Sequence, residues 1–375
     1  MRLKVSRSKN AASFYVTKTV YVDKKERTIT VEKLGTEKEL REKLNGADPY
    51  EWAKNYVAQL NKKEQEESRQ VLIKRQQSKL IGKGVQQSFN GGYLFLQELY
   101  HQLKLDRICR AISLKHKFTF NLDSILSRLI YGRILYPSSK LNTFQLSKTL
   151  LEQPDFELQH VYRALQVIAK ESDFIQAELY KNSLAIFKRN DKILYYDCTN
   201  YFFEIEQEGG IKQYGPSKEN KPNPIVEMGL FMDGDGIPLA FSINSGNTNE
   251  QLTLQPLEKR ILKDFALSKF VVCTDAGLSS TSNRKFNDRG DRAFITTQSV
   301  KKLKKHLKEW ALAPDGWHLE GTSKTFDIHK IEESEEAKEK YGESMFYKER
   351  WIKEDGLEQH LIVTYSLKYK EYQRQ

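Results

Sequence analysis

Two apolar stretches, each containing an aspartate, are the most informative parts of this sequence. Residues 192–203 read KILYYDCTNYFF, and residues 269–277 read KFVVCTDAG. Both are rich in β-forming residues, which predicts two strands, with Asp197 inside the first and Asp275 at the end of the second. A carboxylate in an apolar strand is costly unless something pairs with it, and a divalent cation does so well. From the pattern alone, the alternative is that each aspartate caps its strand or the helix that follows.

The segments around these strands predict an α/β or α+β fold, because strands in sequence are followed by strands alternating with helices. Short β-forming runs, a helical stretch and a further strand are expected at residues 225–232, 237–244, 249–267 and 291–297. Further along, two apolar runs flank Asp355–Gly356, which is a hairpin signal. Residues 301–375 are therefore expected to be rich in β-structure.

The first half of the chain predicts two other kinds of structure. Residues 13–34 alternate apolar and polar side chains around Asp23–Lys24–Lys25, which predicts a β-hairpin. From Thr36 to about Lys79 the pattern is helical and highly charged, which favours a solvated arm over direct DNA contact. Residues 91–188 carry apolar side chains at helical spacing and predict a helical domain. A helix-turn-helix is conceivable there, but no base-reading pattern is identifiable.

Charge and composition narrow the possible partners. The net charge is +11, and residues 1–90 hold 20 Lys and Arg against 11 Asp and Glu, a net +9. This imbalance suits a polyanion, although a solvated basic surface is the alternative. No apolar run approaches the ~20 residues that cross a bilayer. The three separated cysteines argue against a disulfide framework and a thiolate zinc site, and no secretory signal is found. We therefore expect a cytoplasmic protein.

Several motifs occur together, in order, across residues 190–300. They comprise YYDCTNYFFEIE at 195–206, YGPSK at 214–218, GIPLAF at 236–241, GNTNEQ at 246–251 and VVCTDAGLSSTSN at 271–283. This region resembles the catalytic region of bacterial insertion-sequence DDE transposases. The resemblance is to the group whose RNase H-like core carries a β-rich insertion before the final catalytic glutamate.

The resemblance implies an activity and a set of site residues. Asp197 and Asp275 would be the first two catalytic carboxylates, holding two Mg²⁺ or Mn²⁺ ions for phosphoryl transfer on DNA. The expected reaction is cleavage and strand transfer of the inverted-repeat ends of the chain's own mobile element. Double-stranded DNA is the expected partner, with a dimer assembled on it at the nucleoid. Lys218 and Lys221 would contact DNA phosphates, unless they are simply exposed loop lysines.

A third carboxylate is harder to place. The family carries a glutamate on a helix, with Tyr and Arg upstream and a Lys two turns downstream. Tyr347, Arg350 and Glu354 reproduce the first three spacings, but the Lys position falls on Leu361. Glu354 also precedes the predicted hairpin turn, which is the wrong context for a ligand on a helix. We interpret this match as a coincidence and expect the true glutamate beyond Gln375, in a chain truncated at its C-terminus.

The sequence thus predicts four regions. A basic N-terminal region at 1–85, with its hairpin and charged helix, precedes a helical domain at 86–188. An RNase H-like core at 189–300 and a β-rich insertion at 301–375 follow. Two alternatives to an active transposase stay open: a catalytically incomplete fragment that binds DNA, and a non-transposing metal nuclease on the same core.

Overall fold

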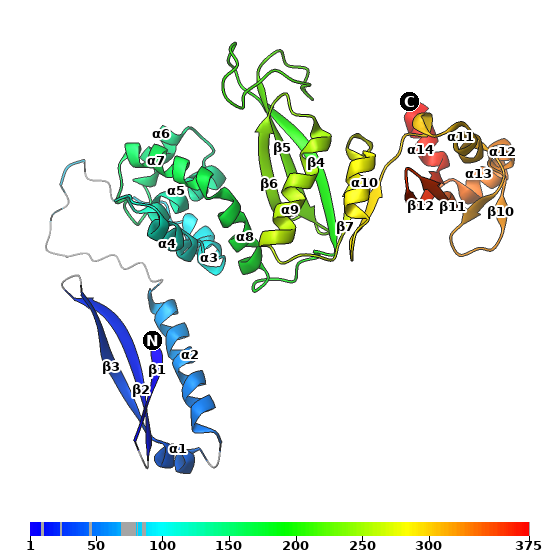
Figure 1. Ribbon diagram of the computed structural model, residues 1–375. Helices are drawn as coiled ribbons and strands as arrows, with labels where there is room; N and C mark the ends of the chain where they lie inside the picture. Colours follow the sequence, from blue (N-terminus) through cyan, green and yellow to red (C-terminus); the bar gives the residue numbers. More distant parts are fainter. Residues whose placement is uncertain are drawn as a thin grey trace. The chain divides into compact units, whose positions relative to one another are not determined.

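The computed structural model describes residues 1–8, 11–22, 25–44, 47–68, 80, 82–84 and 88–374. The chain forms two compact units (Figure 1). The first comprises residues 1–91 with 148–153, and the second comprises residues 92–147 with 154–375. Helices and strands occur in both, so the fold is mixed α and β, as the sequence predicted. No helix in the described ranges is long and apolar enough to span a bilayer.

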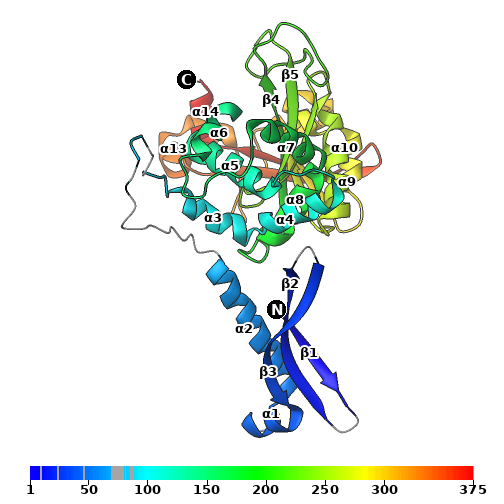
Figure 2. The ribbon, with the colours of Figure 1, turned by 90° about the vertical axis from the view of Figure 1, so that its left-hand side faces the viewer.

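The first unit is built on a three-stranded antiparallel sheet in the order β1-β2-β3 (Figures 1 and 2). Strands β2 (Ala12–Val22) and β3 (Lys25–Thr36) confirm the predicted hairpin, although Asp23 and Lys24 lie outside the described residues. Strand β1 (Arg2–Arg7) was not predicted from the sequence. Its alternation of RLKVSR is short, and its arginines and lysine resemble an unstructured basic leader.

Two helices pack on one face of this sheet. Helix α1 (Glu37–Lys43) starts at Thr36, whose hydroxyl accepts the Glu39 N–H while the Glu39 carboxylate accepts the Thr36 N–H at 2.8 Å. Helix α2 spans Pro49–Ser68 and buries Ala53 against Phe14 and Leu40. The predicted charged helix is therefore two helices, and the part of that prediction at 69–79 lies outside the described residues.

Six helices open the second unit, as predicted for residues 91–188. Loops around 136–139 and 148–157 separate α5 from α6 and α6 from α7. Their bounds are α3 (Tyr93–Gln102), α4 (Leu105–Lys115), α5 (Leu122–Leu135), α6 (Lys140–Ser147), α7 (Leu158–Lys170) and α8 (Ser172–Ser183).

A five-stranded sheet follows, in the order β6-β5-β4-β7-β8. Strand β5 pairs antiparallel with β4 and with β6, whereas β7 pairs parallel with β4 and with β8. All five strands lie where the β-forming runs predicted them. Their bounds are β4 (Ile193–Phe202), β5 (Ile225–Asp233), β6 (Pro238–Ser245), β7 (Val271–Thr274) and β8 (Ala293–Thr296).

Helices cover one face of this sheet (Figure 1). Along β4, Leu194, Tyr196 and Cys198 are buried while the residues between them are exposed, because successive strand residues point to opposite faces. The buried face forms one apolar core with α8 and α9 (Leu254–Asp264). Only glycine fits at position 229, since a Cβ there would lie 2.1 Å from the hydroxyl oxygen of Tyr196.

A buried ion pair fixes the turn between β5 and β6. The Arg189 guanidinium pairs with the Asp233 carboxylate, and both side chains are almost fully buried. Arg189 also donates to the carbonyl oxygens of Ile237 and Pro238, at 3.1 Å each. The second Asp233 oxygen accepts the Ile237 N–H at 2.9 Å. The covered side of the sheet is therefore held by polar contacts as well as by apolar packing.

Residues 297–374 contain more helix than the sequence predicted. The expected hairpin is present as β11 (Phe346–Glu354) and β12 (Leu357–Tyr365), in a sheet ordered β10-β9-β11-β12. Four helices accompany it, and the short amphipathic patterns of the first three were overlooked beside the stronger strand signals. The remaining bounds are β9 (Trp317–Leu319), β10 (Thr325–Phe326), α11 (Lys305–Leu312), α12 (Ile328–Glu333), α13 (Glu335–Tyr341) and α14 (Leu367–Arg374).

Candidate active site

Asp197 and Asp275 stand on neighbouring parallel strands. The register of β4 and β7 pairs Ile193 with Val271, Leu194 with Val272 and Tyr195 with Cys273. The pairing ends there, and Asp275 follows the last residue of β7 with its backbone still extended (φ −80°, ψ 178°). Continued by two residues along each strand, the same register aligns Asp197 with Asp275. Adjacent strands lie about 4.8 Å apart, and residues two apart share a face. The two strands that carry the aspartates are therefore neighbours in one sheet.

Both aspartates belong to the face of the sheet that helices α8 and α9 leave open. The side chain of Asp197 is 67% exposed, and Asp275 is also exposed. Apolar neighbours on this face are exposed too, from 36% at Ile193 and 43% at Tyr195 to 63% at Ile295. Solvent, and any ligand, therefore has access to the two carboxylates.

Each carboxylate is oriented by one backbone N–H group. Oδ1 of Asp197 accepts the N–H of Cys198 at 2.8 Å, and Oδ1 of Asp275 accepts the N–H of Leu278 at 3.2 Å. The second contact caps a short 3₁₀ helix, η2 (Ala276–Leu278), so the capping alternative holds for Asp275 in part. Neither Oδ2 atom accepts a hydrogen bond from the residues that the structure describes. One oxygen of each carboxylate is therefore free to bind a cation.

These two residues alone fit a divalent cation incompletely. Carboxylate oxygens are the right donors for Mg²⁺ or Mn²⁺, and two of them face the same open surface. Within the described ranges, however, no group of three or more His, Cys, Asp or Glu side chains is arranged to hold a metal ion. The two aspartates thus supply part of a ligand set.

Among the described residues, Glu354 forms no metal-binding group with the two aspartates. It is the last residue of β11, next to the turn in which Asp355 and Gly356 take φ of 53° and 79°. Its carboxylate pairs with the Lys304 ammonium at 3.0 Å and is 20% exposed. The neighbouring Asp355 contacts Thr281 at 3.1 Å, so the hairpin tip rests against α10 (Thr281–Asn287). The strand context agrees with the interpretation of Glu354 as a chance match.

The loop that carries Lys218 and Lys221 returns to β4. Asn200 holds it, accepting the Lys218 N–H at 3.3 Å and donating to the Pro216 carbonyl at 3.1 Å. The Lys218 ammonium donates to the Cys198 carbonyl and lies 3.9 Å from Oδ1 of Asp197. Lys221 points instead at the ring of Phe202, 5.4 Å from its centroid. Of these two lysines, Lys218 is therefore the one beside Asp197.

Glycines allow this loop to approach the turn that follows β6. A Cβ on Gly215 would lie 1.9 Å from the carbonyl oxygen of Gly246, and a Cβ on Gly246 would lie 2.2 Å from that of Ile225. Backbone therefore packs directly on backbone at these two positions, one in each of the YGPSK and GNTNEQ motifs. The two motifs adjoin in the structure although about 30 residues separate them in the sequence.

Glu227 is a residue that the sequence interpretation overlooked. It is 4% exposed on the covered side of β5, and its Oε1 has no hydrogen-bond partner. Burial first, and the charge of Glu250 second, raise the pKa of its carboxyl to about 7. The available signal was a lone acidic residue inside the apolar run IVEMGLFM, at 225–232.

A polar cluster neighbours Glu227 behind the site. The Thr253 hydroxyl donates to the carbonyl of Glu250 at 2.7 Å, so the Tyr196 hydroxyl, 2.6 Å away, donates to Thr253. The thiol of Cys198 lies 3.3 Å from the same Thr253 oxygen, and burial raises its pKa to about 11. Cys198 is therefore a neutral buried thiol next to Asp197 in the sequence.

Comparisons with known proteins give limited information. No protein-family model matches this chain, and no curated protein matches it. Among solved structures, the piggyBac transposase synaptic complex with hairpin DNA is 11% identical over 68% of this chain and 56% of that one, with a TM-score of 0.33. The Mos1 transposase paired-end complex with the left transposon end is 14% identical over 45% and 57%, with a TM-score of 0.19. This chain thus spans little more than half of either transposase.

Proposed function

We propose that this chain is part of a DNA transposase of the DDE type, in which Asp197 and Asp275 are the first two catalytic carboxylates. The observation that carries the proposal is the register of β4 and β7, which brings both aspartates to one level on the open face of the sheet. The strand order β6-β5-β4-β7-β8, with its first three strands antiparallel, supports an RNase H-like core. The ordered motifs of residues 195–283 supply the link to transposases.

The two carboxylates would act as a cation-binding pair. Two like charges on adjacent strands repel each other, and a shared cation removes that repulsion. The free Oδ2 atoms of Asp197 and Asp275 would bind Mg²⁺ or Mn²⁺, which in such sites activate water and stabilise the leaving 3′-oxygen. The Cys198 and Leu278 N–H groups would keep each side chain oriented as it binds. Positioning is most of what this chemistry asks of the protein.

Lys218 would assist by holding the substrate. Its ammonium lies beside Asp197, on a loop that Asn200 and two close-packed glycines hold in place. A DNA phosphate entering the site would meet this charge close to the carboxylates. Lys221 would bind phosphate further along the same loop, after leaving the ring of Phe202.

A second candidate function follows from the incomplete ligand set. Because the described residues hold no group of three metal-binding side chains, this chain by itself would bind DNA without cutting it. A misplacement of about 1 Å can already cost ~100-fold in rate, and the loss of a ligand costs more. Such a chain would occupy the ends of its element.

The test uses the purified chain and labelled fragments that carry the DNA on either side of its gene. We expect preferential retention of fragments with terminal inverted repeats over scrambled ones, without nicking in Mg²⁺ or Mn²⁺. Asp197→Asn should not weaken this binding when no cation is present, because the aspartate itself repels phosphate. Equal retention of all fragments would contradict the transposase proposal.

Nicking would decide between the alternatives. Cleavage at the terminus that Asp197→Asn abolishes, with Asp235→Asn as the matched surface control, would show that residues 1–375 contain the third ligand. Cation-dependent cleavage at no preferred position would instead favour a metal nuclease.

A further inference from the structure

The three-stranded sheet of the first unit has one face that its helices do not cover. Along β1, Leu3 and Val5 are half-buried towards the helices, whereas Arg2, Lys4 and Ser6 are exposed. Residues directly opposite each other on paired strands point to the same face. The register therefore continues this outer face across the sheet in cross-strand rows. These rows are Arg2–Thr17–Thr30, Lys4–Tyr15–Lys33 and Ser6–Ser13–Thr36.

The outer face is cationic and rich in hydroxyl groups. Within residues 2–6, 13–19 and 27–36, its charged side chains are Arg2, Lys4 and Lys33, all exposed, and none is acidic. The remaining positions in these rows are Ser, Thr and Tyr, of which Thr17 is buried and donates to the Arg2 carbonyl at 3.2 Å. Val31, which the register shift leaves between two rows, is 47% exposed. Glu32 points to the opposite face, where its carboxylate accepts the Tyr56 hydroxyl of α2 at 3.1 Å.

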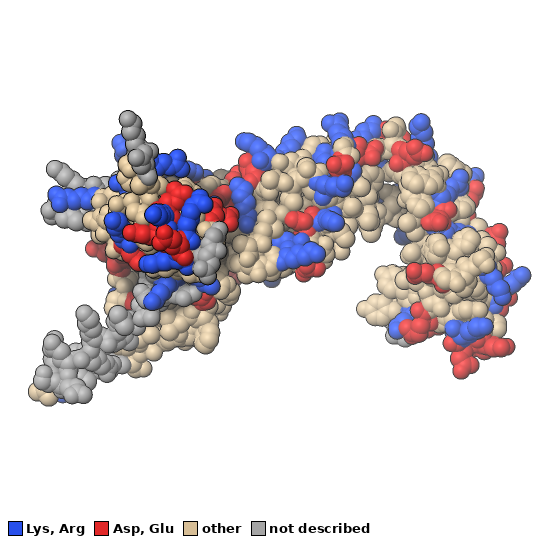
Figure 3. All heavy atoms as spheres, turned by 90° about the horizontal axis from the view of Figure 1, so that it is seen from below, with Lys and Arg blue, Asp and Glu red and all other residues tan. Residues whose placement is uncertain are grey.

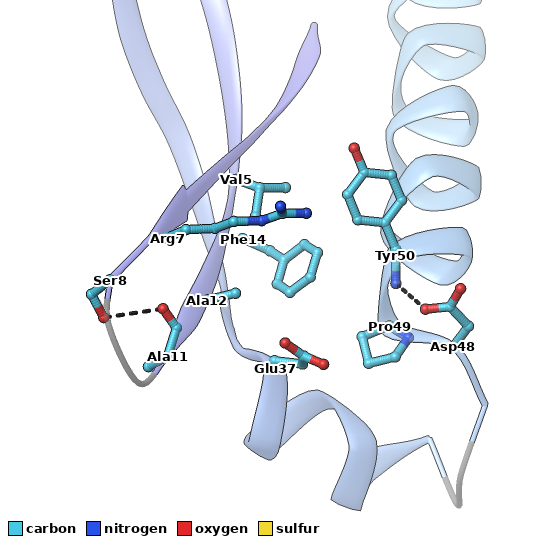
Figure 4. Close-up of a pocket in the computed structure, with 10 residues that line it drawn as sticks. All are labelled: Val5, Arg7, Ser8, Ala11, Ala12, Phe14, Glu37, Asp48, Pro49 and Tyr50. Atoms are coloured by element: carbon cyan, nitrogen blue, oxygen red, sulfur yellow. Dashed lines mark hydrogen bonds between the residues drawn. The ribbon is translucent and has the colours of Figure 1, made fainter.

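The helix side of the same unit carries both signs of charge. Arg7 points into a cavity of about 360 Å³ between the sheet and the helices, which Glu37 and Asp48 also line (Figure 4). Across the face of the molecule seen in Figure 3, Lys and Arg are interspersed with Asp and Glu. Net charge alone therefore does not locate a surface for a polyanion, whereas the uniform sign of the outer sheet face does.

The row Lys4–Tyr15–Lys33 has the dimensions of a DNA groove. Its outer strands are two strand spacings apart, about 10 Å, and the major groove of B-DNA is about 12 Å wide. The two lysines would face the phosphate chains that border the groove. Tyr15 and Ser13 on the central strand would face the base edges, with hydroxyls that can donate or accept. In protein–DNA complexes, contacts to phosphates usually position the protein on the duplex, and contacts to base edges read the sequence.

We propose that the outer face of β1, β2 and β3 binds duplex DNA by entering the major groove. Other proteins place strands in a groove in this way. The choice of DNA as the partner rests on the proposed function, whereas the choice of surface rests on this sheet. Helices α1 and α2, which the sequence analysis regarded as an arm, then support the sheet rather than contact the DNA.

The experiment compares two triple variants of the full chain, each of which removes three positive charges from the first unit. One is Arg2→Ala/Lys4→Ala/Lys33→Ala on the outer face. The matched control is Lys38→Ala/Lys54→Ala/Lys62→Ala, at exposed positions of α1 and α2. Binding to a fluorescent 30-base-pair duplex of mixed sequence is measured in EDTA from 50 to 300 mM salt. No cleavage can then occur, so a failure of the catalytic proposal leaves this result unaffected.

The outer-face variant should bind at least ~10-fold more weakly, and its log–log salt slope should be smaller by about 2–3, since each lost phosphate contact removes ~0.9. The helix-side control should change both values far less. Equal losses in the two variants would mean diffuse attraction by net charge and would overturn the proposal. So would an unchanged outer-face variant. Circular dichroism checks that both triple variants fold. If the outer-face triple variant does not fold, the single variants Lys4→Ala and Lys33→Ala replace it, and each should lower the salt slope by ~0.9.

A second arm tests the groove and the class of nucleic acid. A duplex whose major groove is filled by glucosylated hydroxymethylcytosines should bind the wild-type chain at least ~10-fold more weakly than the plain duplex, and no better than the outer-face variant binds the plain duplex. Equal binding of the two duplexes would contradict entry into the major groove. Tighter binding of the corresponding single strand or RNA duplex would contradict B-form DNA as the partner.

Discussion

The two main sheets of this chain share a construction but expose opposite chemistry. Each has one face packed against helices and one face open to solvent. The open face of the three-stranded sheet carries Arg2, Lys4 and Lys33, whereas the open face of the five-stranded sheet carries Asp197 and Asp275. Cations suit the phosphate chain of a nucleic acid, and paired carboxylates suit a divalent cation. The covered faces determine folding, and the open faces are available for binding and chemistry.

That division predicts large stability effects at buried positions of the covered faces and small ones at exposed positions. Arg189→Leu removes one partner of a buried ion pair and leaves the Asp233 carboxylate uncompensated, which should cost about 3–5 kcal/mol of unfolding free energy. Lys181→Ala breaks only an exposed contact to Glu178 and should cost less than about 0.5 kcal/mol. Urea unfolding at neutral pH measures both, and similar costs would contradict the division.

The buried carboxyl of Glu227, on the covered face of the five-stranded sheet, should make the stability of the protein depend on pH. Its carboxyl pKa rises from 4.5 to about 7 on folding, so the folded state binds more protons between these values, and stability falls as pH rises through that window. Glu227→Gln cannot ionise and should become more stable than the wild type by on the order of 2–3 kcal/mol at pH 8, with little difference at pH 4.5. Unfolding of both proteins at the two pH values tests this.

A matched substitution separates burial from a general charge effect. Glu219→Gln, at an exposed position of the Lys218 loop, should show no such dependence on pH. If the Glu227→Gln and wild-type curves run parallel, the carboxyl is not neutralised by burial behind the site.

The smallest expected effect concerns the Lys218 loop. Lys218→Ala removes one ammonium beside Asp197 and should lower the salt slope of DNA binding by ~0.9, with a several-fold loss of affinity at 100 mM salt. Lys263→Ala, on helix α9 of the covered side, is the control with the same charge change. Equal effects would remove Lys218 from the proposed DNA-binding surface.

The sequence predicted the five-stranded sheet well because its signals are local. The β-forming composition of residues 192–203 and 269–277, and the aspartates at strand positions, are readable without tertiary information. Strand pairing is not local, so the register that aligns Asp197 with Asp275 needed the structure. Glu227 was overlooked because a single glutamate in an apolar run is normally assumed to face solvent.

Other misses have equally specific causes. Strand β1 was not predicted because its charges, at Arg2 and Lys4, conceal an alternation with only two apolar residues, Leu3 and Val5. Helices α11, α12 and α13 were overlooked because each is at most 8 residues long, too short for a clear helical period. For Glu354 the prediction was right: the turn signal Asp355–Gly356 predicted a hairpin, and Glu354 ends its first strand.

The most direct test of the central claim is cation binding by the aspartate pair. Mn²⁺ is titrated into the wild-type chain, Asp197→Asn, Asp275→Asn and the surface control Asp235→Asn, with free Mn²⁺ followed by electron paramagnetic resonance. If the two carboxylates share a cation, both single variants should lose at least ~10-fold in Mn²⁺ affinity. The double variant Asp197→Asn/Asp275→Asn should lose little more, because either change already breaks the site. Equal Mn²⁺ affinity in the wild type and both single variants would contradict the account.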